Sequence, residues 1–236
     1  VRLVGSEMCI RDSLIPIAQG DALELPVSAL TRDGLLEALE AVGVTGAHGE
    51  INKVVLDGVL YISVGLGEDT SATSVRRAMG VAARSLTGID RAVVSGEFGV
   101  GAIVEGLLLG GYSYSGLKTS DSENSENSAN TEAEKSGDTS LAITVIGRED
   151  EREEFETAAT IGHAVALARD LVNTPSNLLY PEVYAAHAEK VATDAGLAVE
   201  ILDDAQLHGQ GFGGITAVGQ GSEHAPRLVH LTWAPE

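Results

Sequence analysis

The segment EREEFETAATIGHAVALARDLVNTPSNLLYP, residues 151–181, decides how the chain is organised. Its apolar residues recur every three or four positions, the spacing of one helix face: Phe155, Ala158, Gly162, Val165, Ala168 and Val172. Asp150 is expected to cap the helix, and Pro175 to stop it, because a residue before proline avoids the helical conformation. We therefore predict a helix of about 22 residues. A second helix is expected to open at Pro181, since proline is favourable in a first turn.

Strand and helix patterns alternate upstream of this segment. Apolar and β-branched runs predict strands at 14–17, 54–56, 59–64, 91–95 and 141–146. Helical spacing predicts three helices. They lie at 30–44, at 100–109, and between a cap at Thr70 or Ser71 and an end at Gly88. The dipeptide Asp57-Gly58 is typical of a hairpin turn. This alternation indicates an α/β fold on a mostly parallel sheet with both faces covered.

The pattern resumes downstream of Pro181. It predicts helices at 181–195 and 203–208, the second capped by Asp203 or Asp204, and strands at 197–202, 215–218 and 227–233. These elements are interpreted as the start of a second α/β sheet. The last strand would have an unpaired edge or an uncovered apolar face. We therefore expect the isolated chain to aggregate, or its C-terminal part to be poorly ordered.

Composition narrows the possible functions. Of 236 residues, 44% are hydrophobic and only 4% aromatic, which favours an aliphatic core. The formal net charge of −20 disfavours nucleic acids and anionic membranes as partners. One cysteine, Cys9, excludes an internal disulfide and is typical of a reducing compartment. No apolar run is long enough to span a membrane.

Four separated stretches share a pattern with one known family. They are VLYISVGLG (59–67), VEGLLLGGYSYSGLK (104–118), RDLVNTPSN (169–177) and GLAVEILDDAQLHGQGFGGITAVGQGSEHAPRLVHLTW (196–233). In this order they resemble the leucyl (cytosol) aminopeptidase family, from about Leu14 to Glu236. The resemblance implies an N-terminal macro-like α/β domain, a long linking helix, and the first strands and helices of an α/β catalytic domain, which is truncated.

The resemblance also implies a domain division and an activity. The expected divisions are 14–147 for the N-terminal domain, 148–174 for the linking helix and 175–236 for the beginning of the catalytic domain. Such enzymes are cytoplasmic hexamers that hydrolyse N-terminal residues from peptides with two divalent metal ions, Zn or Mn, and a bicarbonate as general base. Their metal ligands follow the strand that RLVHLTW forms here. We therefore assign no catalytic, cofactor-binding or metal residue, and expect no metal in this chain and no activity. The alternative is a stand-alone macro-like binding or oligomer-assembly module.

Two segments are set apart from the fold. Residues 1–13, VRLVGSEMCIRDS, do not begin with Met and resemble a translated sequencing adapter, so we interpret them as non-native. They are no signal peptide, because Glu7, Arg11 and Asp12 interrupt the apolar run. Residues 119–140 hold no aliphatic side chain larger than Ala and carry six acidic groups against one lysine. We expect this insertion to be disordered.

Two glycine-rich stretches could bind anions. Gly209–Gly214, GQGFGG, matches G-x-G-x-x-G, but it is expected to follow a short helix and precede a strand, whereas a dinucleotide site follows a strand and opens a helix. Gly96–Gly101, GEFGVG, is expected to open a helix, whose N-terminus could hold an anion. The other interpretation, which we prefer, is a tight backbone turn.

The remaining candidates are weaker. Ser115–Lys118 matches S-x-x-K without its partner motifs. Asp203-Asp204 is interpreted as a helix cap rather than an acid/base pair. The histidines show no tight metal-ligand spacing: His48, His163, His187, His208, His224 and His230.

Overall fold

The computed structural model describes residues 2–4, 12–20, 23–26, 29, 32–114, 116 and 141–234. The chain divides into two compact units, Val1–Arg169 and Asp170–Glu236, with the boundary inside a long helix. Each unit is described by itself. The acidic insertion expected at 119–140 lies outside the described residues.

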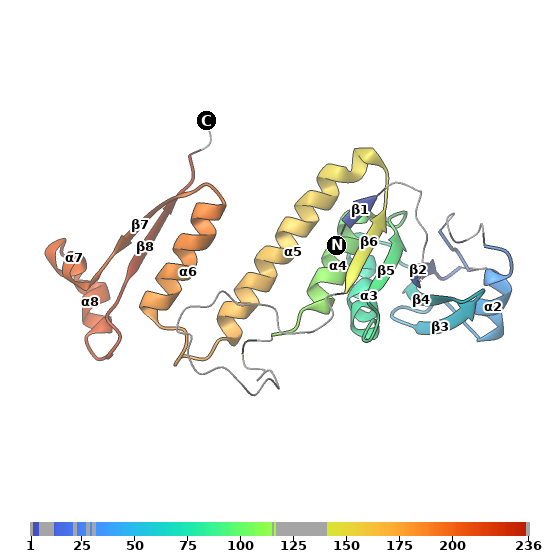
Figure 1. Ribbon diagram of the computed structural model, residues 1–236, viewed down its shortest axis with the longest axis horizontal. Helices are drawn as coiled ribbons and strands as arrows, with labels where there is room; N and C mark the ends of the chain where they lie inside the picture. Colours follow the sequence, from blue (N-terminus) through green and yellow to red (C-terminus); the bar gives the residue numbers. More distant parts are fainter. Residues whose placement is uncertain are drawn as a thin grey trace. The chain divides into compact units, whose positions relative to one another are not determined.

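The first unit is built on a six-stranded sheet (Figure 1). Its strands are β1 (Arg2–Val4), β2 (Asp12–Ala18), β3 (Ile51–Leu56), β4 (Val59–Gly67), β5 (Arg91–Ser95) and β6 (Ala142–Ile146), in the order β1-β6-β5-β2-β4-β3. Only β3 runs antiparallel to its neighbour. The prediction of an α/β fold on a mostly parallel sheet is confirmed.

The N-terminal residues take part in this sheet. Arg2–Val4 lies parallel to β6, and β2 begins at Asp12, two residues before the expected strand. The hydrogen-bonded register of β2 with β4 includes Asp12 and Ser13, which explains the extension. That residues 1–13 are non-native stays a prediction.

The hairpin between β3 and β4 has the predicted turn. Asp57 and Gly58 take positive φ angles of 51° and 77°. Positive φ at both central residues is the type I′ geometry that matches the twist of the flanking strands. The pairing of Leu56 with Val59 closes the ladder beside this turn.

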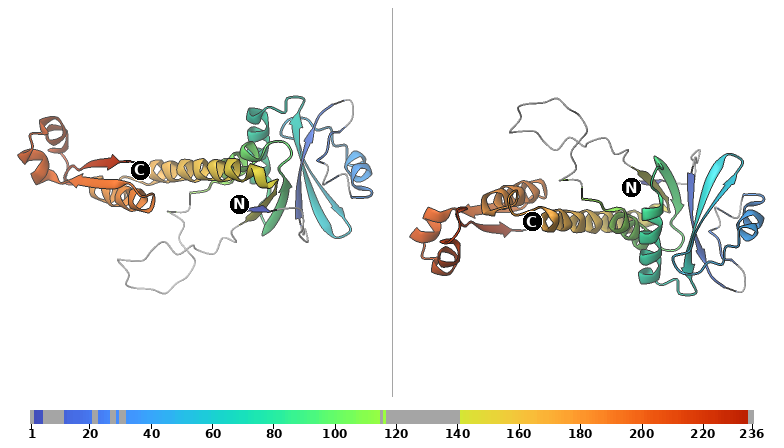
Figure 2. Two further views of the ribbon diagram at one scale, coloured as in Figure 1. Left: turned by 90° about the horizontal axis from the view of Figure 1, so that it is seen from above. Right: turned by 90° about the horizontal axis from the view of Figure 1, so that it is seen from below.

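Two apolar clusters lie on opposite faces of the sheet, as the alternation along β4 requires. Ile62, Val64 and Leu66 belong to the larger cluster, with helices α3 (Ala72–Ser85) and α4 (Val100–Gly111). Tyr61 belongs to the smaller cluster, with helix α2 (Leu35–Ala41). Figure 2 shows α2 and α3 on the two sides of the sheet.

The ends of these helices correct parts of the sequence analysis. Ser71 caps α3, with its hydroxyl accepting a hydrogen bond from the Ser74 amide, as predicted. However, α3 ends at Ser85 rather than at Gly88, and α2 spans seven residues rather than 30–44. Gly34, which has a φ of 77°, precedes α2 and interrupts the expected longer helix.

Helix α5 (Arg152–Asn173) has 22 residues, the predicted length. Asp150 does not cap it, because Glu149–Glu151 form a 3₁₀ turn before it. The Glu151 carboxylate instead accepts the Arg148 amide at 2.7 Å. The cap therefore belongs to the 3₁₀ turn, a common form of helix N-terminus.

The second unit follows the predicted order with one correction. It contains α6 (Pro181–Asp194), β7 (Ala198–Leu202), α7 (Asp204–Gly209), α8 (Gly213–Gly219) and β8 (Leu228–Thr232). The strand predicted at 215–218 is wrong, since these residues lie in α8. The Thr216 amide and hydroxyl both donate to the Phe212 carbonyl, which favours a helical turn. A four-residue apolar run is too short for its period to separate strand from helix.

Candidate functional site

The glycine-rich loop Gly96–Gly101 connects β5 to α4. The Gly96 amide donates a 2.7 Å hydrogen bond to the Ile146 carbonyl at the end of β6. A Cβ at Gly96 would lie 2.6 Å from Val100 Cγ2 and 2.8 Å from the Ile146 oxygen, so only glycine is accommodated there. This is the tight backbone turn that we preferred from the sequence.

The N-terminus of α4 already holds an anion from the same chain. Glu154 Oε1 accepts a hydrogen bond of 2.9 Å from the Gly101 amide. A helix N-terminus attracts negative charge through its unpaired amides and its dipole. The place where an external anion would be recognised is therefore taken by a carboxylate of α5.

The C-terminal end of α4 contacts a positively charged side chain of α5. Arg169 Nη1 donates a 2.8 Å hydrogen bond to the Leu109 carbonyl, and the guanidinium lies 5.4 Å from the centre of the Tyr112 ring. Cations are favourable at helix C-termini. Glu154 and Arg169, both on α5, thus each bind one end of α4.

A small pocket lies against the sheet of the first unit. Most of its lining is apolar, including Leu14 and Ile15, and its polar members are Ser13, Arg32, Tyr61 and Ser95. The Ser95 hydroxyl donates to the Glu97 carboxylate at 3.1 Å. The pocket brings together no pair of groups suited to acid/base or nucleophilic chemistry.

The G-x-G-x-x-G stretch runs from Gly209, the last residue of α7, to Gly214 in the first turn of α8. The expectation that it precedes a strand is wrong, since it opens α8. It nevertheless lacks the context of a dinucleotide site, because α7 separates it from β7. Cβ atoms added at Gly209 or Gly214 would meet nothing within 4 Å, so no neighbouring atom of the described residues requires glycine at these positions.

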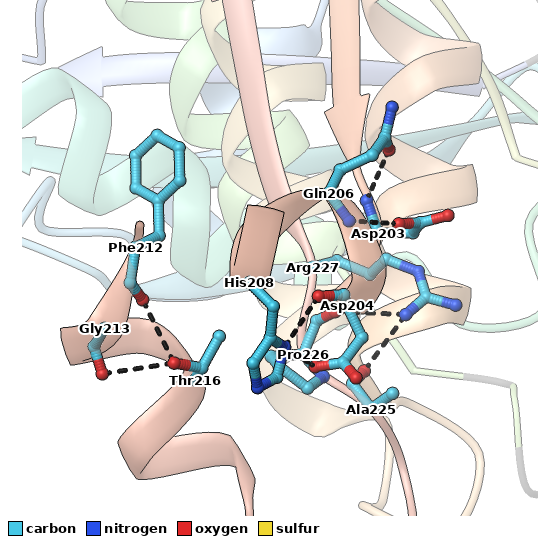
Figure 3. Close-up of polar contacts among 10 residues, drawn as sticks. All are labelled: Asp203, Asp204, Gln206, His208, Phe212, Gly213, Thr216, Ala225, Pro226 and Arg227. Carbon is cyan, nitrogen blue, oxygen red and sulfur yellow. Dashed lines mark hydrogen bonds and ion pairs between the residues drawn. The ribbon is translucent and has the colours of Figure 1, made fainter. Parts of the chain in front are cut away.

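The Asp203-Asp204 pair is a helix cap, as predicted. Asp203 Oδ1 accepts the Gln206 amide at 2.8 Å, and Gln206 Oε1 accepts the Asp203 amide at 2.9 Å (Figure 3). This reciprocal arrangement is a capping box. Asp204 faces His208 one turn later, with Oδ1 3.4 Å from Nδ1. His208 is exposed and Asp204 is partly buried, and the structure shows no hydrogen bond from either side chain to the Asp203 carboxylate.

The histidines are dispersed among separate contacts. His48 Nε2 lies 3.2 Å from the Ser74 carbonyl, and His224 stacks on Tyr180 with ring centres 4.0 Å apart. His230 faces Glu200 across the β7–β8 pair at 3.6 Å. Among the described residues, no three His, Cys, Asp or Glu side chains are grouped so that they could hold a metal ion. Ser115 and Lys118 of the S-x-x-K match lie outside the described residues.

Two regions of the chain match the domains of one known protein family. Residues 20–121 match the N-terminal domain of the cytosol aminopeptidase family, and residues 166–236 match the catalytic domain of the same family. The chain belongs to the cytosol aminopeptidase family. The resemblance seen in the sequence is thereby confirmed.

The curated relatives are more than twice as long as this chain. A probable cytosol aminopeptidase of Corynebacterium diphtheriae is 43% identical over 94% of the chain, which covers 45% of that relative. A Rhodococcus jostii relative with the same description is 36% identical over 92% of the chain and 43% of its own length. The chain thus spans less than half the length of these relatives.

Solved structures have the same fold. A bottromycin maturation enzyme in complex with Mn superposes with a TM-score of 0.74 and 24% identity, over 96% of the chain and 46% of that enzyme. A tomato leucine aminopeptidase mutant gives a TM-score of 0.69 and 22% identity, over 98% of the chain and 50% of its own. In the part of the chain that the structure describes, no helix is both long and apolar enough to cross a membrane.

Proposed function

We propose that the chain forms the N-terminal domain, linking helix and first catalytic-domain elements of a leucyl aminopeptidase that removes N-terminal residues from peptides. The observation that carries this proposal is the order of the two family matches along one chain, 20–121 and then 166–236. The identity of 43% to a probable cytosol aminopeptidase supports the same reaction class.

Catalysis in this proposal depends on two divalent metal ions, Zn or Mn. Support comes from the Mn complex of the bottromycin maturation enzyme, which shares the fold. The described residues do not fit a metal site, since none of their carboxylates and imidazoles form a group of three. We therefore place the metal ligands in the part of the catalytic domain that the relatives carry beyond the matched region, and infer that this chain alone is inactive.

Cellular location and assembly complete the proposal. Relatives named cytosol aminopeptidases support action in the cytoplasm. The family resemblance implies a homo-hexamer, which the mass of the protein in solution by multi-angle light scattering would test.

A chimera tests the reaction. The chain is fused to the part of the Corynebacterium diphtheriae relative that follows its matched region, and hydrolysis of leucine p-nitroanilide is measured with Mn²⁺ or Zn²⁺. We expect activity that a chelator abolishes in the chimera, and none in the chain alone. A folded chimera without metal-dependent hydrolysis, or hydrolysis by the chain alone, would overturn the proposal.

A further inference from the structure

The pocket against the sheet of the first unit, which we call the sheet pocket, has a continuous floor. The register pairs Ser13 of β2 with Tyr61 of β4 and with Val93 of β5. Residues that pair directly across a sheet share one face, so these three side chains lie side by side. Two residues further along β5, Ser95 pairs with Ile146 of β6, and both line the pocket. The floor is therefore one surface on four adjacent strands.

A series of turns before α2 forms the wall of the sheet pocket. Pro26, Ala29 and Arg32 line this wall at intervals of three residues. The Ala29 amide donates to the Pro26 carbonyl at 2.9 Å, and the Arg32 amide donates to the Ala29 carbonyl at 3.1 Å. The Leu35 amide donates to the Arg32 carbonyl at 3.2 Å, and Leu35 is only 1% exposed. Backbone hydrogen bonds and a buried side chain thus fix Arg32 beside the pocket.

Two polar side chains of the sheet pocket are available to a ligand. Tyr61 is only 4% exposed, and within the described residues its hydroxyl has no hydrogen-bond partner. The Arg32 side chain reaches solvent and forms no ion pair in the part of the chain that the structure describes. A buried hydroxyl without a partner is unfavourable, and a guanidinium offers donors that match a carboxylate. Both groups donate, so together they favour an acceptor with negative charge.

We propose that the sheet pocket binds a small carboxylate that carries a short apolar chain. The ligand's carboxylate accepts hydrogen bonds from the Arg32 guanidinium and the Tyr61 hydroxyl, while its apolar chain lies on Ile15 and Val93. The empty space is about 400 Å³, part of it open to solvent, which is at the lower end of the range for ligand pockets. Ser13 lies in the segment that we interpret as non-native, and its hydroxyl is not among these contacts.

The charges around the sheet pocket decide where the carboxylate lies. Among the described residues that line the pocket, only Arg32 is charged. The Ser95 hydroxyl is already engaged, since it donates to the Glu97 carboxylate at 3.1 Å and accepts the Glu97 amide at 3.4 Å. Glu97 disfavours a second anion at that end. The net charge of −20 is spread over the whole chain, and charges more than about 10 Å apart are largely screened at 0.1 M salt.

Ligand-observed NMR tests the proposal on the full chain at low concentration. Saturation transfer from the protein to 4-methylpentanoate is measured as the ligand is titrated. We expect saturable binding with a Kd of about 1 mM, as for a ligand with few heavy atoms. 4-Methylpentanamide, which has the same shape without the charge, should bind about tenfold more weakly or less.

Three variants connect the binding to named side chains. Arg32→Gln should weaken binding of the carboxylate about tenfold or more, and Tyr61→Phe about fivefold, because each removes a donor. Arg77→Gln is the matched control, since it removes an exposed arginine of α3, on the other face of the sheet. It should leave the Kd unchanged. Circular dichroism of each variant should match that of the native chain.

Leucine distinguishes two sources of the ligand, because it has the same carboxylate and chain with an added ammonium group. Binding of leucine as tight as that of 4-methylpentanoate assigns the pocket to free amino acids, and much weaker binding assigns it to carboxylic acids without an amine. The proposal is overturned if binding does not saturate, if the amide binds as tightly as the acid, or if Arg32→Gln and Arg77→Gln have equal effects. No hydrolysis is measured, so such a failure leaves the proposed function intact.

Discussion

Glu154 Oε1 accepts a hydrogen bond from the Gly101 amide across 53 positions of sequence. The same helix places Arg169 on the Leu109 carbonyl at the opposite end of α4. A carboxylate thus lies at the N-terminus of α4 and a guanidinium near its C-terminus, each with the sign that the helix dipole favours. Helix α5 is therefore attached to the first unit by charge as well as by the buried side chains Phe155 and Ala158.

Removing this carboxylate should destabilise the first unit. Glu154→Ala leaves the Gly101 amide without its partner and is expected to lower the free energy of unfolding by ~1 kcal/mol, a typical capping loss. Urea titration followed by circular dichroism measures the change. Glu153→Ala, one residue earlier on an exposed part of α5, is the matched control and should have little effect. Equal losses in both variants would contradict the capping role.

The crossing of α3 and α4 depends on Gly106 and Gly110, where a Cβ would meet the backbone of α3, but not on Gly80. A Cβ at Gly106 would lie 2.5 Å from the Arg76 carbonyl and 2.6 Å from Met79 Cβ, whereas one at Gly80 would meet nothing closer than 3.6 Å. We expect Gly106→Ala to cost about 1–3 kcal/mol through overpacking. Gly80→Ala should be neutral or stabilise by up to about 1 kcal/mol, because alanine favours a helix interior. Thermal unfolding of both variants checks the pair, and similar shifts in both would disprove the close crossing.

Glu50 should make the first unit sensitive to acid. Burial raises its pKa, but hydrogen bonds from Thr45, Asn52 and the Ala47 amide outweigh this, and the net pKa lies below the ordinary value of 4.5. Because the folded-state pKa is depressed, the stabilisation is present above pH 4.5 and is lost as the pH falls through the folded-state value. We expect Glu50→Gln to lower the melting temperature at pH 7 and to reduce its decline between pH 5 and pH 3. A pH profile of the melting temperature that is unchanged by Glu50→Gln would refute the prediction.

Hydrogen exchange should distinguish the two units. Amides of β7 and β8 belong to a two-stranded ribbon, while those of β4 and β5 lie inside a six-stranded sheet. We expect the ribbon amides to exchange faster in the isolated chain, because local opening there disrupts few buried contacts. Mass spectrometry after brief labelling measures both sets in one sample. Protection of β8 equal to that of β5 would show that the second unit is stable alone, contrary to the expectation of a poorly ordered C-terminal part.

Light scattering tests the expected aggregation. The isolated chain should form large species as its concentration rises, because the exposed apolar side chains of the second unit, such as Val218 and Trp233, can associate non-specifically. Trp233→Asp should delay this, and Val55→Asp should not. A monodisperse native chain at high concentration would contradict this expectation.

The sequence by itself determined the features that depend on neighbouring residues. The length of α5, the Asp57-Gly58 turn, the Ser71 cap and the Asp203 cap all follow from spacing or from hydrogen bonds within a few positions. The family resemblance could also be recognised from the sequence, because the four motifs occur along the chain in the order typical of the family. Two local predictions were wrong: Asp150 does not cap α5, and residues 215–218 form a helix rather than a strand. That the chain carries no catalytic or metal residue stays a prediction.

Only the tertiary structure decided what the charged and apolar side chains do. No sequence pattern relates Glu154 to Gly101, because the β6 strand and the packing of α5 bring them together. The anion-binding interpretation of Gly96–Gly101 gave way to an internal cap for that reason. Likewise, the apolar residues of both units look alike in sequence, yet those of the first unit are buried between sheet and helices and many of the second are exposed. Burial depends on which elements cover a face, and a single element's sequence does not specify its neighbours.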